Sequence, residues 1–253
     1  MKTDWDYTSL ATSYLKRPGY AEAAIRKMLS LAGTAPGAAV CDIGAGTAAL
    51  TLKLAERSFK IVAIEPNATM RKIGEEKTVL FSNVRWSDGT GENTNQASSD
   101  FDLVTFGSSF NVTDRPLALR ESARILAPSG WLACLWNHRD LADPLQQSIE
   151  VVIQSRLPQY DYGARRQDQT HLMESSSLFS KVHRIEASQE HTQSLEDCVE
   201  AWRSHATLHR QAGTRFEEII REIEKVLCST GKKEIRIPYT TGVWMAQVLK
   251  EKK

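Results

Sequence analysis

Apolar runs and amphipathic segments alternate along the first half of the chain. Five short segments predict strands, at residues 38–43, 60–65, 83–87, 101–106 and 130–136. Between them, apolar side chains recur at the three- and four-residue spacing of amphipathic helices, over residues 47–57, 67–76 and 114–126. Some strand segments are apolar on both faces, as in a parallel sheet that helices cover. The alternation predicts an α/β fold with a doubly wound, mostly parallel sheet.

The pattern loosens after Trp136, where late helices and strands are expected. They are, in order, a helix over 143–157, a loop over 158–170, a strand over 181–193, helices over 194–213 and 214–232, and β-rich sequence over 234–250. Pro238 and Gly242 predict a break or a sheet edge in the last segment. With these two late strands the sheet is expected to have seven strands.

Composition and charge exclude several classes of protein. With 253 residues, 41% of them hydrophobic, the chain can bury the core of one α/β domain and is not a disordered segment. No apolar run is long enough to span a bilayer, and residues 1–10 lack the apolar core of a secretory signal. The four cysteines form no C-x-x-C pair. We therefore expect a reduced, cytoplasmic protein that acts away from membranes.

Residues 40–57 combine a strand, a glycine-rich turn and a helix. Gly44, Gly46 and Ala49 satisfy the loose pattern G-x-G-x-x-G/A, in which the backbone and the helix N-terminus can approach a ligand closely. Glu65 ends the second strand, where an acidic residue can bind ribose hydroxyls. These features fit both a nicotinamide dinucleotide and S-adenosylmethionine.

Asp42, two residues before the first glycine, favours the second of these molecules. A carboxylate would repel the pyrophosphate of a dinucleotide. The same carboxylate would attract the ammonium and sulfonium groups of S-adenosylmethionine, directly or through water. The alternative is a structural aspartate that caps the junction between strand and turn.

Four blocks resemble, in order and spacing, the signature blocks of the class I S-adenosylmethionine-dependent methyltransferases of small-molecule type. They are CDIGAGTAALT, AIEPNATM, FDLVTF and ARILAPSGWLACLW, within residues 41–136. Residues 14–20, YLKRPGY, resemble a Y-x-x-R-P-x-Y segment of the same superfamily. The resemblance implies a Rossmann-like methyltransferase fold in one domain over 1–253. Its parts would be an N-terminal helical lid (1–33), a cofactor-binding core (34–140), and acceptor-side helices with closing strands (141–253).

The resemblance also implies which residues hold the cofactor, S-adenosyl-L-methionine, and its product S-adenosyl-L-homocysteine. Asp42, Gly44 and Gly46 would line the methionine end, and Glu65 would bind the ribose. The other implied contacts are Tyr14 and Arg17 over the cofactor carboxylate, Pro66, Asn67 and Met70 beside the adenosine, Gly89, Thr90, Gly91 and Glu92 beside the adenine, and Phe106 and Gly107 facing the sulfonium. Three features depart from the pattern: Ala48 replaces a frequent third glycine, Thr90 replaces a frequent aspartate, and APSG replaces the commoner proline-glycine-glycine turn.

The acceptor side of the reaction needs alignment and, for some acceptors, removal of a proton. His138 and Asn137 follow the fifth strand, at the edge where α/β sites open. His138 is a candidate general base, because its ordinary pKa is about 6.5. Asn137 is a candidate for orienting the acceptor. The alternative is that both residues cap the following turn.

Weaker acceptor-side candidates come from later segments. Trp202, His205 and His209 share one face of the helix expected over 194–213, where they could line the acceptor pocket or simply pack. No third ligand accompanies the two histidines, so we expect no metal. The remaining candidates are Ser108 and Asn111 after the fourth strand, and Tyr160 and Tyr162 in the polar loop.

We therefore expect an S-adenosylmethionine-dependent methyltransferase that modifies an O, N or C atom of a small-molecule metabolite. An NAD(P)-dependent Rossmann oxidoreductase and a non-catalytic S-adenosylmethionine-binding protein are the alternatives. The net charge of +1 and the lack of a dense basic stripe argue against a nucleic-acid partner. The acceptor and the oligomeric state stay open.

Overall fold

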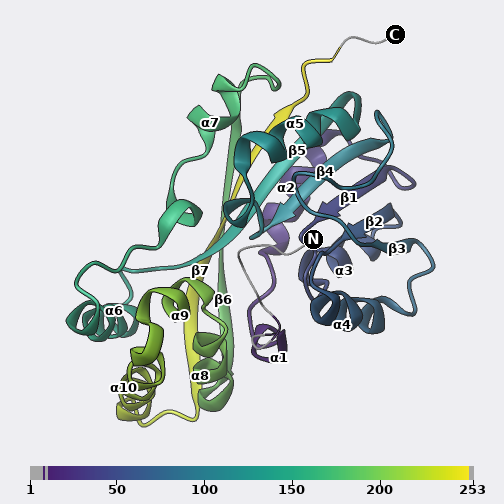
Figure 1. The fold of residues 1–253 in the computed structure, drawn as a ribbon. Helices are drawn as coiled ribbons and strands as arrows, with labels where there is room; N and C mark the ends of the chain where they lie inside the picture. Colours follow the sequence, from purple (N-terminus) through teal and green to yellow (C-terminus); the bar gives the residue numbers. More distant parts are fainter. Residues whose placement is uncertain (1–7, 9–10, 251–253) are drawn as a thin grey trace.

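The computed structural model describes residue 8 and residues 11–250, which contain one seven-stranded mixed sheet (Figure 1). The strands are β1 (Ala39–Ile43), β2 (Lys60–Ile64), β3 (Val84–Ser87), β4 (Phe101–Gly107), β5 (Leu126–Arg139), β6 (His183–Ser194) and β7 (Glu234–Gln247). Their order across the sheet is β3-β2-β1-β4-β5-β7-β6. The first five pair in parallel, and β7 runs antiparallel to both β5 and β6. The predicted α/β class and strand number are confirmed.

The helices follow the expected alternation in the first half. They are α1 (Ala11–Tyr14), α2 (Glu22–Ala32), α3 (Ala49–Ala55), α4 (Ala68–Thr78), α5 (Arg115–Ile125), α6 (Pro144–Arg156), α7 (Thr170–Ser175), α8 (Leu195–Arg203), α9 (Ala206–Ala212) and α10 (Phe216–Ser229), with short 3₁₀ turns at Phe110–Val112, Gly163–Arg166 and Gly213–Arg215. Asn67, Asp114 and Asp143 each accept a hydrogen bond from a backbone N–H of the first helical turn that follows. These caps fix where α4, α5 and α6 begin.

Apolar side chains fill both faces of the sheet, because alternate strand residues point to opposite sides. One cluster joins the strands to α5 and includes Phe106 and Trp136. The other joins them to α2 and α3 and includes Met28 and Leu50. The sheet is therefore covered on both faces, as the apolar strands predict.

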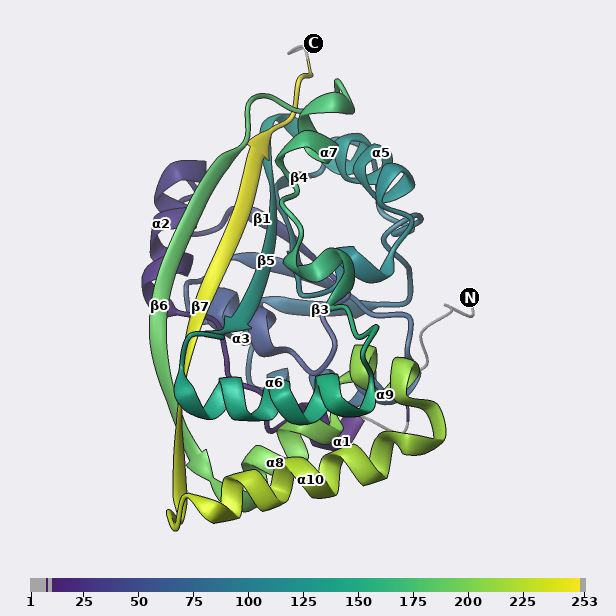
Figure 2. The same cartoon turned by 90° about the vertical axis from the view of Figure 1, so that its left-hand side faces the viewer.

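A third apolar cluster lies at one end of the two long strands β6 and β7. It joins α6, α8, α9 and α10 to the first residues of β7, with Trp202 and Ile237 among its members. Figure 2 shows α6, α8 and α10 gathered at this end of the strands. The late helices are thus anchored beside the sheet, near the ends of β5 and β7.

The second half agrees with the prediction at one position and differs at another. Strand β7 runs without a break through Pro238 and Gly242, but Pro238 lies just beyond the end of β5 and pairs in the sheet with β6 only, so an edge position is confirmed there and a break is not. The prediction of a single helix over 194–213 is wrong, because the segment forms two helices, α8 and α9. His205 breaks it with a non-helical backbone (φ −82°, ψ 82°) and stands at the N-cap position of α9.

Candidate functional site

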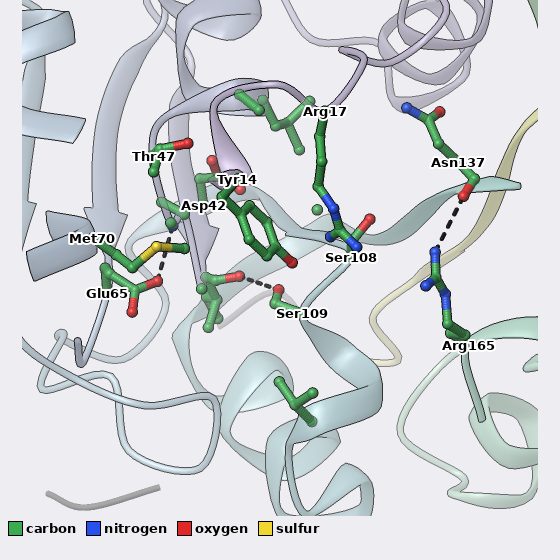
Figure 3. Close-up of a pocket in the computed structure, with 18 of the residues that line it drawn as sticks. Tyr14, Arg17, Asp42, Thr47, Glu65, Met70, Ser108, Ser109, Asn137 and Arg165 are labelled. Carbon is green, nitrogen blue, oxygen red and sulfur yellow. Dashed lines mark hydrogen bonds between the residues drawn. The ribbon is translucent and has the colours of Figure 1, made fainter. Parts of the chain in front are cut away.

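A pocket opens at the carboxyl ends of β1, β2 and β4, between the glycine turn and the late helices (Figure 3). It gathers most of the residues that the sequence assigned to a cofactor. They are Tyr14, Arg17, Asp42, Gly44, Gly46, Glu65, Pro66, Asn67, Met70, Thr90, Gly91, Glu92 and Gly107. Gly89 and Phe106 do not line it, and the Phe106 ring packs against Phe110 in the core, with centroids 5.2 Å apart.

The glycine turn follows the end of β1 and takes a left-handed backbone at three positions. Gly44 and Gly46 have φ of 66° and 56°, and a Cβ on Gly44 would lie 2.4 Å from the Cβ of Ser109. Ala48 also has a positive φ, of 70°, and stands at the N-terminus of α3. A positive φ costs a residue with a Cβ about 1 kcal/mol, and glycine avoids this cost. Glycine would therefore suit the position that Ala48 occupies in this chain.

Asp42 is a buried carboxylate that, among the residues the structure describes, accepts side-chain hydrogen bonds from two hydroxyl groups. The Thr51 and Thr105 hydroxyls donate to its two oxygens, at 2.6 and 2.9 Å. Burial outweighs these bonds and raises the pKa of Asp42 to about 6. Within residues 11–250, no lysine or arginine forms an ion pair with Asp42. The turn therefore offers a negative charge that an incoming cation can neutralise.

Glu65 is oriented by the backbone of the same turn. Its Oε2 accepts from the Gly46 N–H at 2.9 Å and its Oε1 from the Asn67 N–H at 2.8 Å. Burial raises the pKa of Glu65, and the two N–H donors partly oppose that rise. Each carboxylate oxygen keeps a second lone pair, which can accept from a hydroxyl in the pocket.

The segment around Arg17 crosses the pocket and is fastened on its far side. Arg17 donates from Nε to the Ser204 hydroxyl at 3.0 Å, and its guanidinium lies 4.1 Å from the Tyr14 ring centroid. The Asn137 Nδ2 donates to the Pro18 and Gly19 carbonyls, at 3.2 and 2.9 Å. This segment therefore covers the site and connects the glycine-turn side with β5 and α8.

The two candidate catalytic residues face different surroundings. Asn137 lines the pocket, but its Oδ1 accepts from the Thr241 hydroxyl at 2.5 Å, so its amide is held by the protein. His138 does not line the pocket, and its Nε2 donates to the Arg165 carbonyl at 2.8 Å. Burial, together with nearby Arg166 and Arg165, lowers the pKa of His138 to about 4. A ring outside the pocket with a lowered pKa disfavours His138 as the general base, a role that stays a hypothesis.

The weaker acceptor-side candidates are also divided by the structure. His205 and Tyr162 line the pocket, and Ser108 lines it with its hydroxyl 3.0 Å from the Tyr20 OH. Asn111 lines a small neighbouring cavity and accepts from the Trp136 indole at 2.8 Å. The others lie outside both cavities and pack against rings or guanidinium groups: Trp202, His209 and Tyr160.

The sequence reasoning missed the arginines of the pocket wall. Arg139 ends β5, while Arg165 and Arg166 come from the 3₁₀ turn that follows Tyr162. A signal was available, because residues 163–166 read GARR beside two tyrosines in a segment expected to be a plain loop. What could not be read is that this turn folds back against the end of β5.

Residues 8 and 11–250 contain no group of three His, Cys, Asp or Glu side chains arranged to hold a metal ion. None of the helices in those residues is both long and apolar enough to cross a membrane.

Comparison with known proteins identifies a family through its model and adds relatives of lower similarity. The model of the ubiE/COQ5 methyltransferase family matches residues 24–190. A demethylmenaquinone methyltransferase of Staphylococcus carnosus is 29% identical over 126 residues, which are 48% of this chain and 52% of that protein. The chain thus spans about half the length of the curated relatives it matches.

Solved structures show the same fold at low sequence identity. The YcgJ protein of Bacillus subtilis has a TM-score of 0.58 at 18% identity, over 92% of this chain and 100% of that chain. Phosphoethanolamine N-methyltransferase 2 of Haemonchus contortus, solved with S-adenosyl-L-methionine, has a TM-score of 0.56 at 12% identity, over 95% and 57% of the two chains. These likenesses concern the arrangement of the strands and helices.

Proposed function

Because this chain belongs to the ubiE/COQ5 methyltransferase family, we propose that it binds S-adenosyl-L-methionine in this pocket and transfers the methyl group to a small-molecule metabolite. The methylated atom would be an O, N or C atom. The product of the cofactor would be S-adenosyl-L-homocysteine.

The observation that carries the proposal is the pair of buried carboxylates at the glycine turn. Asp42 and Glu65 are 1% and 7% exposed and lie at the ends of the neighbouring strands β1 and β2. Two negative groups favour a ligand that carries an ammonium, a sulfonium and a ribose diol. Asp42 disfavours the pyrophosphate of a nicotinamide dinucleotide, whose charge has the same sign, whereas Glu65 would suit the ribose of either cofactor. The oxidoreductase alternative is therefore less favoured.

Different pocket residues would bind different parts of the cofactor. Asp42 with the amides of the turn would hold the methionine end, and Glu65 the ribose hydroxyls. Arg17 would take the cofactor carboxylate, because a guanidinium binds carboxylates in a bidentate way. The other contacts remain those of the resemblance: Tyr14 over the cofactor, Pro66, Asn67 and Met70 at the adenosine, Thr90, Gly91 and Glu92 at the adenine, and Gly107 by the sulfonium.

We expect alignment of the two reactants to supply most of the catalysis. S-adenosylmethionine supplies an activated methyl group when bound, so the chain must hold the acceptor in line and exclude water. His205 is the histidine of the pocket wall, but its Nε2 accepts from the Arg165 guanidinium at 3.0 Å, and burial lowers its pKa well below the ordinary value. Its lone pair is therefore not free to take a proton.

Incubation with labelled S-adenosylmethionine and a metabolite extract, followed by mass spectrometry, tests the proposal. A product heavier by one methyl group, absent with an Asp42→Asn/Glu65→Gln double variant, is the expected result. Binding of S-adenosylmethionine without any labelled product would favour the non-catalytic alternative. Binding of a nicotinamide cofactor in its place would favour the oxidoreductase.

A further inference from the structure

Four arginines gather at the end of the pocket that lies away from Glu65. They are Arg17, Arg139, Arg165 and Arg166, and all four line the pocket. Figure 3 shows Glu65 and Met70 on one side, Arg17 with Ser108 between, and Arg165 with Asn137 on the other side. Among the residues that the structure describes, none of the four forms an ion pair with a carboxylate.

Arg165 is held by neutral groups and surrounded by like charges. Its guanidinium donates to the His205 Nε2 at 3.0 Å and to the Asn137 carbonyl at 3.4 Å. Loss of solvent lowers its pKa to about 10, and Arg17 and Arg139 add to that effect. Gathering cations in this way is unfavourable unless an anion joins them.

Arg139 and Arg166 are fixed by aromatic rings and backbone, which leaves donors unused. The Arg139 guanidinium lies 4.0 Å from the Trp202 ring centroid, and its buried Nε has no hydrogen-bond partner. Arg166 lies 4.6 Å from the Tyr162 ring centroid and donates one bond, to the Arg139 carbonyl at 2.9 Å. Stacked guanidinium groups lose little further freedom on binding, so they are preorganised for an oxyanion.

We propose that the methyl acceptor carries an anionic group, a carboxylate or a phosphate, that Arg139, Arg165 and Arg166 bind. The inference rests on the proposed function, in which Arg17 serves the cofactor carboxylate and the space beyond Ser108 receives the acceptor. Planar guanidinium donors match both carboxylate and phosphate oxygens. The anionic group would fix the acceptor at one end and place its reactive atom toward the glycine turn.

Calorimetric titration with three aromatic probes of similar size tests this directly. Benzoate, phenyl phosphate and the neutral benzamide are titrated into the chain saturated with S-adenosylhomocysteine, at constant ionic strength. We expect at least one anion to bind and benzamide not to bind. Arg165→Gln should weaken the affinity for the anion by about tenfold or more, because a charge-assisted hydrogen-bond pair is lost. The anion that binds more tightly shows whether the acceptor carries a carboxylate or a phosphate.

Matched variants keep the outcome interpretable. Arg221→Gln on the exposed face of α10 is the control and should leave anion affinity unchanged. Arg166→Gln is the second test variant in case Arg165→Gln does not fold. Equal binding of benzamide and benzoate, or unchanged affinity in both variants, overturns the inference. Weaker S-adenosylhomocysteine binding with unchanged anion binding also overturns it, because these arginines would then serve the cofactor. Failure of S-adenosylhomocysteine to bind the native chain would instead overturn the proposed function.

Discussion

At the scale of single residues, the buried Asp42 carboxylate beside the glycine turn lowers the free energy of unfolding of the unliganded protein. The pKa of Asp42 is raised to about 6 by burial, against an ordinary value of 3.8. A carboxyl with a raised pKa stabilises the folded chain while it is protonated. That contribution is complete below about pH 4 and is lost as the pH rises through about 6. The cationic cofactor proposed above would explain this charge, which folding alone does not.

Asp42→Asn is predicted to stabilise the unliganded protein and to weaken cofactor binding. The amide removes the buried charge, and the threonine hydroxyls can rotate to suit it. Thermal unfolding at about pH 7.5 should show a gain of up to about 3 kcal/mol, the equivalent of the pKa shift. The gain should shrink toward about pH 4. An equal or lower melting temperature at neutral pH would show that Asp42 is a structural cap.

Glu65→Gln is predicted to weaken S-adenosylhomocysteine binding by roughly 2 kcal/mol, about thirtyfold, because charge-assisted bonds to the ribose are lost. Calorimetry measures the affinity, and amide hydrogen exchange around Gly46 checks that the turn is intact. Glu75→Gln, an exposed residue of α4, is the control with unchanged affinity. Native-like affinity in the Glu65 variant would remove Glu65 from the ribose site.

His138 is predicted to stay neutral throughout the physiological range. Its pKa of about 4 means that turnover should show no ionisation of this residue between about pH 6 and 8. Because its ring lies outside the pocket, His138→Gln should change turnover by about threefold or less. A rate that rises with a midpoint near 6.5, and loses that rise in the variant, would restore His138 as the general base.

At the scale of elements, the segment from α1 to α2 lies over the pocket and contacts α8 and β5, and we propose that it works as a cover. Lys16 pairs with Asp197 of α8 at 2.8 Å, and the Ser13 hydroxyl donates to Glu200 at 2.9 Å. These contacts are mostly exposed and individually weak. A ligand that adds a bond to Arg17 would therefore hold the cover more firmly.

Cofactor binding is predicted to protect the amides of residues 11–20 from hydrogen exchange. Mass spectrometry with and without S-adenosylhomocysteine measures this protection. Arg17→Ala should weaken binding by about tenfold and reduce the protection. Arg26→Ala, exposed on α2, should change neither. Equal exchange with and without ligand in the native chain would show that the segment is not a cover.

Elements specified by local sequence were predictable, and contacts between distant segments were not. The strands β1 to β5 and the caps of α4 and α5 follow from apolar runs and from Asn67 and Asp114. No glycine or proline stands at the break between α8 and α9, so the local sequence does not predict it. His205 leaves the helix where its ring stacks on Trp202, at a centroid distance of 5.5 Å, and meets Arg165. Such tertiary contacts override local helix propensity.

The site was predictable to the same extent as the fold. The cofactor side follows one glycine turn and the strand after it, so motif spacing placed Asp42 and Glu65 correctly in the pocket wall. The acceptor side joins β5, the turn at 163–166 and α9, which are far apart in the sequence. For that reason Arg165 was overlooked, and His138 was expected where only its neighbour Asn137 lines the pocket.

At the scale of the whole molecule, the pocket has two chemically different halves, which come from different strands of the sheet. The parallel strands β1 and β2 present carboxylates, and the end of β5 with the turn at 163–166 presents guanidinium groups. A cationic cofactor and an anionic acceptor would each meet the opposite charge. Under the proposals above, the fold would separate the two binding tasks and bring the reactants together near Ser108.

Calorimetric titration of the native chain with S-adenosylhomocysteine and, separately, with NAD⁺ tests the central claim most directly. Asp42 and Glu65 predict one site for S-adenosylhomocysteine, weakened in Glu65→Gln, and the charge of Asp42 predicts no binding of NAD⁺ at the same concentrations. Binding of NAD⁺ with no binding of S-adenosylhomocysteine would contradict the assignment of this pocket.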